Sequence, residues 1–178
     1  MSSRELLLEA IGIAHRAVDR IEWSILEKSS ELRVEVVSLA NRLRDLYRYI
    51  AKLFEVIANK VPENLGGNSV VAHGSYFYTV IYPDRLVIVR NRPLHIVLSY
   101  VKNSDSIVVK TRYLKAIFKP NRFEAAIYNF KVELAIDNPE EYRSKSAELR
   151  YILREVGNVF ERYIVPIAEA RLGESIRY

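Results

Sequence analysis

RFEAAIYNFKVELAI (residues 122–136) is the last of five consecutive runs rich in Val, Ile, Tyr and Phe. The other four runs are VVAHGSYFYTVIY (70–82), RLVIVR (85–90), LHIVLSYV (94–101) and IVVKTRYLKAIFK (107–119). This composition is typical of β-strands, and turn residues such as Pro83–Asp84 separate the runs. The connections are too short for crossover helices, so we predict an antiparallel meander of about five strands over residues 69–136.

The last run also predicts which face of the sheet is covered, because alternate residues of a strand point to opposite faces. One face would carry Ala126, Tyr128, Phe130, Val132, Leu134 and Ile136. The other would carry Ala125, Ile127, Asn129, Lys131 and Glu133. We expect helices to cover the first face, with Phe130 in the core, and to leave the second face at least partly open.

Residues 3–61 have the apolar period of helices, with seams that step by four and three residues. The phase of the seam changes at Lys28–Ser29–Ser30. A single helix over this span would be roughly 85 Å long at 1.5 Å per residue. We therefore predict a helical hairpin broken near Ser29–Ser30 and closed by Pro62 and the Gly66–Gly67–Asn68 run.

Residues 138–178 are predicted to form a long helix, with Asn138 as its N-cap, Pro139 in its first turn and a kink at Pro166. Its apolar seam consists of Leu149, Ile152, Val156, Val159 and Tyr163. One isolated helix cannot bury this seam, which can fold back on the hairpin or meet its copy in another chain. We favour a homo-oligomer, a dimer or tetramer, joined by this helix, with residues 1–137 forming an α+β binding domain.

The charge of the chain is concentrated in its middle. The protein has 27 Lys and Arg residues against 22 Asp and Glu. Residues 1–65 hold ten of each kind, and residues 137–178 hold seven basic and eight acidic residues. Residues 66–136 hold ten basic and four acidic residues, a net charge of +6. A basic, aromatic sheet between neutral helical segments is typical of a surface that binds a polyanion, and we predict that this polyanion is single-stranded nucleic acid.

Two groups of side chains are candidates for this surface. Lys and Arg would neutralise phosphates, and tyrosine rings would stack on unpaired bases. The predicted nucleic-acid-binding residues are Tyr76, Tyr78, Tyr82, Arg90, Arg92, Lys110, Arg112, Tyr113, Lys115, Lys119 and Arg122. The alternative is that the cations form a solvated face and the rings pack in the core. By strand alternation Lys110 and Arg112 share one face and Lys115 and Lys119 the other unless a bulge intervenes, which would make two patches.

Other classes of site find little support. The chain has no Cys, and its three histidines, His15, His73 and His95, lack ligand spacing with each other or with carboxylates. We therefore expect no metal, no cofactor and no catalytic activity. No segment is apolar enough to span a membrane and no signal peptide is recognisable, so a cytoplasmic location is the default expectation. The absence of Gln, a single Met and 18 Arg against 9 Lys are typical of a thermophile.

The order of helical segment, basic aromatic strands over residues 75–131 and the Leu149–Tyr163 seam resembles the ThermoDBP family of single-stranded DNA-binding proteins from hyperthermophilic archaea. The resemblance implies a basic-rimmed hydrophobic cleft that holds the strand, subunits joined through helices, and DNA as the favoured ligand. The alternative is a structural or adaptor protein that recruits another protein through its helical seams and binds no nucleic acid.

Overall fold

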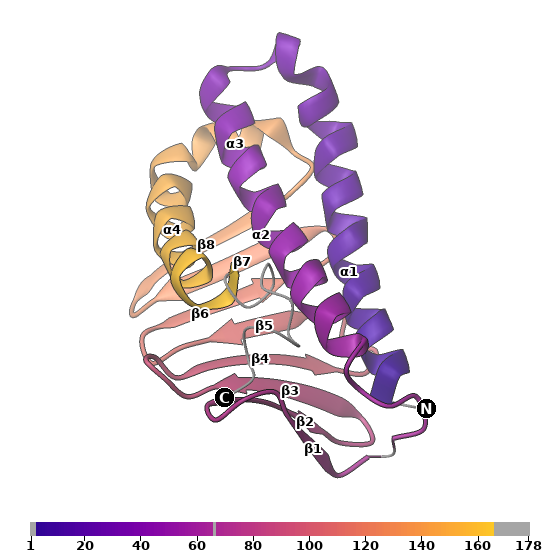
Figure 1. The fold of residues 1–178 in the computed structure, drawn as a ribbon. Helices are drawn as coiled ribbons and strands as arrows, with labels where there is room; N and C mark the ends of the chain where they lie inside the picture. Colours follow the sequence, from indigo (N-terminus) through magenta and orange to yellow (C-terminus); the bar gives the residue numbers. More distant parts are fainter. Residues whose placement is uncertain (1–2, 66, 166–178) are drawn as a thin grey trace.

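The computed structural model describes residues 3–65 and 67–165 and has the predicted α+β organisation (Figure 1). Two N-terminal helices and two short C-terminal helices lie over one face of an eight-stranded antiparallel sheet. No described helix has the length and the apolar character of a membrane-spanning segment.

The N-terminal segment is two helices, as the change of seam phase predicts. Helix α1 spans Ser3–Ser24, a 3-10 turn follows at Leu26–Glu31, and α2 spans Val34–Ala58. The two helices lie side by side (Figure 1), joined by a hydrogen bond between His15 and Glu55 at 3.0 Å and by an ion pair between Arg48 and Glu22 at 2.6 Å.

The sheet is the predicted meander, with each strand paired to the next along the chain. Its strands are β1 Ser69–Ala72, β2 Phe77–Ile81, β3 Arg85–Arg90, β4 Ile96–Val101, β5 Ile107–Lys110, β6 Leu114–Phe118, β7 Arg122–Ile127 and β8 Phe130–Ala135. The predicted number of about five strands was wrong. Three of the five apolar runs reverse direction internally, at residues 73–76, 111–113 and 128–129.

The hidden turns also correct the predicted faces of the last run. Ile127 pairs with Phe130 across a two-residue turn, so Ala125 and Ile127 face the helices together with Val132 and Leu134. Phe130, which was expected in the core, is 38% exposed because its strand begins there. An apolar alternation that continues through a two-residue turn looks the same as one long strand.

The core lies between the helices and the sheet and is continuous from Leu6 of α1 to the C-terminal helices, where it includes Leu149 and Val156. Tyr47 of α2 is fully buried at its centre, where the ring meets Phe118 edge-on at 5.2 Å. The Tyr47 hydroxyl donates to the carbonyl oxygens of Lys119, at 2.8 Å, and Arg122, at 3.2 Å. This contact fixes α2 over the turn between β6 and β7.

The predicted long C-terminal helix is broken. Asn138 is the N-cap of α3, Pro139–Ser144, and its side chain accepts a hydrogen bond from the Glu140 backbone. Lys145 then leaves helical geometry, with φ −106° and ψ 20°, before α4, Ser146–Val159, and a π-helical turn, Phe160–Ile164. The Lys145 ammonium donates to the Glu133 carbonyl at 2.7 Å, which holds the break against β8. Pro166 and its predicted kink lie outside the described residues.

The predicted oligomerisation seam is folded back within the chain. Leu149, Ile152 and Val156 are fully buried, Val159 is 2% exposed, and Tyr163 is partly buried against the same core. Helix α4 packs on α2, β7 and β8. Burial of this seam therefore needs no second subunit, and subunit association stays a prediction.

Candidate nucleic-acid interface

The meander gathers its turns at two ends of the sheet, and the two ends differ in charge. At one end lie the turns 73–76, 91–95, 111–113 and 128–129, which contain no Asp or Glu. At the other end lie the turns 82–84, 102–106, 119–121 and 136–138, which contain Asp84, Asp105 and Asp137. We call these the basic end and the mixed end. The +6 excess of the strand region is therefore distributed unevenly.

Exposed cations occupy the basic end. Arg92 and Arg112 lie in its turns and Lys110 closes β5, and all three side chains are exposed. The Arg92 guanidinium lies 5.2 Å from the centre of the Tyr76 ring, a cation–π distance. Arg90 is used differently, because its guanidinium donates to the backbone carbonyls of Arg92 and Tyr163. It fixes the π-helical turn to β3 and is partly buried.

A row of lysines continues from the basic end across the open face of the sheet. Lys110 lies directly opposite Lys115 in the β5–β6 pair. Ala126 is the next residue across in β7, and Lys131 follows in β8. The prediction put Lys110 and Lys115 on opposite faces of the sheet. They lie on the same face, because the chain reverses direction at residues 111–113. We call Lys110, Lys115 and Lys131 the lysine row.

The lysine row borders an open hollow whose lining also includes Glu124 and Glu133, the two carboxylates that pair with Arg122. Ala126 is small, and an open hollow of about 150 Å³ lies between Lys115 and Lys131. No ion pair to these three lysines occurs in the described part of the chain. Like charges directly opposite each other destabilise a sheet, so the pairing of Lys110 with Lys115 is unfavourable, and a bound anion would reduce the repulsion.

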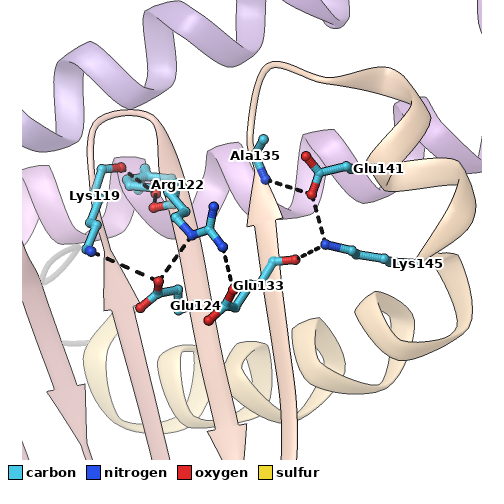
Figure 2. Close-up of polar contacts among 8 residues, drawn as sticks. Lys119, Arg122, Glu124, Glu133, Ala135, Glu141 and Lys145 are labelled. Carbon is cyan, nitrogen blue, oxygen red and sulfur yellow. Dashed lines mark hydrogen bonds and ion pairs between the residues drawn. The ribbon is translucent and has the colours of Figure 1, made fainter.

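Two of the predicted phosphate-binding residues are already neutralised at the mixed end (Figure 2). Lys119 pairs with Glu124 at 4.0 Å, and Arg122 pairs with Glu124 at 3.1 Å and also with Glu133. The hydrogen bond from Arg122 to Glu133 is the largest contribution that raises the pKa of the guanidinium. Lys119 and Arg122 are therefore poorer candidates for phosphate contacts than the lysine row.

The predicted tyrosines are also divided between locations. Tyr78 lies on the open face of β2, opposite Val89, and is half-buried. Tyr82 lies at the mixed end, under the Arg85 guanidinium at 4.4 Å. Tyr76 is 51% exposed at the basic end, and Tyr113 is partly buried there. Only Tyr76 and Tyr113 of the four share the basic end with Arg92, Lys110 and Arg112.

Tyr128 is the most exposed ring of the basic end and was not among the predicted site residues. It is 81% exposed and its ring centre lies 6.3 Å from that of Tyr113. Farther along β8, Phe130 meets Tyr151 of α4 edge-on at 5.1 Å. The sequence gives little signal for Tyr128, because Asn129 is a turn residue but Tyr-Asn is not one of the pairs typical of a two-residue turn.

The strand-region histidines, His73 and His95, hydrogen-bond neighbouring side chains. Among the described residues no group of three or more His, Asp or Glu side chains could hold a metal ion. His95 hydrogen-bonds Asn91 at 2.8 Å, and His73 hydrogen-bonds the buried Thr79 at 2.8 Å while its ring packs on Phe77 at 5.0 Å. His73 therefore has a structural role in the β1–β2 turn.

We expect His73 to make the protein less stable as the pH falls from about 6.5 to about 4. Burial, aided by the charge of Lys60, lowers the pKa of His73 to about 4. The unfolded chain, with a histidine pKa of about 6.5, then binds more protons in this window, so the free energy of unfolding decreases with falling pH. Between pH 7 and pH 5, urea unfolding should show that the free energy of unfolding falls by about 1 kcal/mol more in the wild type than in His73→Asn. This value allows for the partly exposed ring.

The exposed His95 is the matched control for this measurement. His95→Asn should keep the wild-type loss of stability between pH 7 and pH 5. An equal loss in His73→Asn and in the wild type would mean that His73 does not carry the pH dependence.

Comparisons of the chain with protein-family models, with curated proteins and with solved structures gave no match in any of the three. They add no support to the ThermoDBP resemblance. The functional argument therefore depends on the arrangement of side chains in the sheet.

Proposed function

We propose that the protein is a non-catalytic binder of single-stranded nucleic acid, with the basic end and the lysine row as its binding surface. The observation that carries the proposal is the absence of carboxylates from all four turns of the basic end, where Arg92, Arg112 and exposed tyrosines meet. At the mixed end, by contrast, Arg122 is paired with Glu124 and Glu133. An anion would supply the missing negative charge.

The tyrosines favour a single strand over a duplex. Aromatic rings stack on unpaired bases with about 1–3 kcal/mol per base, whereas paired bases are stacked on one another and present only their edges. Tyr76, Tyr113 and Tyr128 lie among the exposed cations at one end of the sheet, so a strand could place phosphates and bases on the same surface. DNA is the favoured strand, on the ThermoDBP resemblance alone.

The rival adaptor function has less support. It depends on apolar helical seams that are free to recruit a partner, but Leu149, Ile152 and Val156 are fully buried within the chain. The seam of α2 is buried as well, including Leu43 and Ile50. The described helices therefore leave neither predicted seam open for a partner protein.

Fluorescence anisotropy with end-labelled oligonucleotides tests the proposal. A 20-nucleotide single strand, as DNA and as RNA, is compared with the matching duplex at increasing salt. We expect the single strand to bind more tightly than the duplex, with log K falling against log[salt] by about 0.7 per phosphate neutralised. Equal affinity for duplex and single strand, or an affinity independent of salt, would contradict the proposal.

A further inference from the structure

We propose that Tyr128 is a stacking platform for one unpaired base, with Tyr113 supporting its ring from behind. The inference rests on the proposed function and deepens it, because it names the side chain that would hold a base and not only a phosphate. It comes from three features of the β7–β8 turn: its backbone conformation, the exposure of its ring, and its contact with the neighbouring turn.

The backbone of Tyr128 is in a conformation that disfavours tyrosine. Its φ is +51°, in the left-handed region that a Cβ atom makes unfavourable. The other non-glycine residues with positive φ in the described chain are Asn68, Asn103 and Asp105, whose short polar side chains tolerate this region. Tyr128 is the exception, because Gly or Asn at this position would give a more stable turn.

Packing of the Tyr128 side chain does not offset the unfavourable backbone conformation. With 81% of its surface exposed, the ring contributes little to the core. Its ring contact is with Tyr113, at 6.3 Å between centres and 33° between planes. The Tyr128 ring thus stays largely in water, beside the ring of Tyr113. An aromatic face held toward solvent is what base stacking requires.

The neighbouring turn supplies both rigidity and charge. The Tyr128 amide donates to the Tyr113 carbonyl at 3.2 Å, which ties the β7–β8 turn to the β5–β6 turn. Arg112 precedes Tyr113 in that turn and is exposed. Lys131, an exposed member of the lysine row, lies three residues after Tyr128. A base on the Tyr128 ring therefore has cations on both sides for the adjoining phosphates.

The substitutions Tyr128→Asn and Tyr128→Gly separate binding from folding, because both residues suit a positive φ. We expect the melting temperature to stay equal or to rise, while affinity for the 20-nucleotide single strand falls by about 10-fold or more, the equivalent of about 1.4 kcal/mol. The slope of log K against log[salt] should not change, since no charge is removed. Tyr128→Phe should retain wild-type affinity. The matched control is Trp23→Ala, which removes an exposed ring on α1 and should leave affinity unchanged.

A fluorescence experiment tests the stacking directly. Trp23 is the only tryptophan, so Tyr128→Trp in a Trp23→Phe background places a single reporter in the turn. Single-stranded DNA should quench this reporter, and an oligonucleotide of abasic sites should not. Wild-type affinity in Tyr128→Asn together with no quenching would overturn the inference and leave the proposed function intact. Failure of the wild type to bind any oligonucleotide would remove the proposed function and this inference together.

Discussion

Replacement of Arg92, Lys110 and Arg112 by alanine should lower the affinity for a single strand by about 100-fold at low salt. All three side chains are exposed at the basic end, and none forms an ion pair in the described part of the chain. A loss of about 1 kcal/mol per phosphate contact, the typical net contribution of one hydrogen bond, gives about 3 kcal/mol in total. The slope of log K against log[salt] should become shallower by about 2, since each neutralised phosphate contributes about 0.7.

A matched triple variant distinguishes local contacts from overall charge. Lys28, Arg33 and Lys102 are exposed and lie away from the basic end, and their replacement by alanine removes the same three charges. We expect this variant to lose much less affinity. Both variants should stay folded, because exposed substitutions usually change stability by about 0.5 kcal/mol or less. Equal losses in the two triple variants would show that net charge, and not the basic end, governs binding.

The sequence could predict that residues 69–136 form an antiparallel sheet of consecutive strands, but it could not predict all of the turns. Val, Ile, Tyr and Phe in each run indicate strands, and the short connections require antiparallel neighbours. Turns marked by Pro or Asp, such as Pro83–Asp84, were recognised. The turn at Tyr128–Asn129 was not, because the apolar alternation resumes at Phe130 after only two residues. Similarly, Lys145 breaks the C-terminal helix without a Pro or Gly to mark the position.

The hidden turns also decide how much of the candidate site was predictable. The excess of cations in residues 66–136 is a property of composition and is visible in the sequence. Which cations lie together depends on register, and the reversal at residues 111–113 brings Lys110 opposite Lys115. Pairing across strands, as between Arg122 and Glu133, depends on the same register. The predicted binding residues therefore included those of the basic end and also residues such as Arg122, whose ion pairs link neighbouring strands.

The seam of α4 gives a different lesson, because its heptad spacing predicted burial without naming the partner. A stripe such as Leu149, Ile152 and Val156 needs an apolar surface, and either α2 or a second chain satisfies that need equally well. In this protein α4 packs on α2, and an ion pair between Arg150 of α4 and Glu35 of α2 joins the two helices. An amphipathic period thus identifies a buried face but not the molecule that buries it.

Ile152→Glu should therefore unfold the protein instead of dissociating an assembly. The Ile152 side chain is fully buried between α4 and its neighbours, and a carboxylate there would have no counter-charge in the core. We expect a loss of about 4 kcal/mol or more, which approaches the lower end of the stability of an ordinary domain, about 5–15 kcal/mol, and would be visible as lost near-ultraviolet circular dichroism. Asn158→Glu, on the exposed side of the same helix, should stay folded. Light scattering on the wild type, whose single chain is 20.6 kDa, measures subunit association separately. If Ile152→Glu instead gave a folded chain of half the wild-type mass or less, the seam would join subunits and its burial against α2 would not be what stabilises the fold.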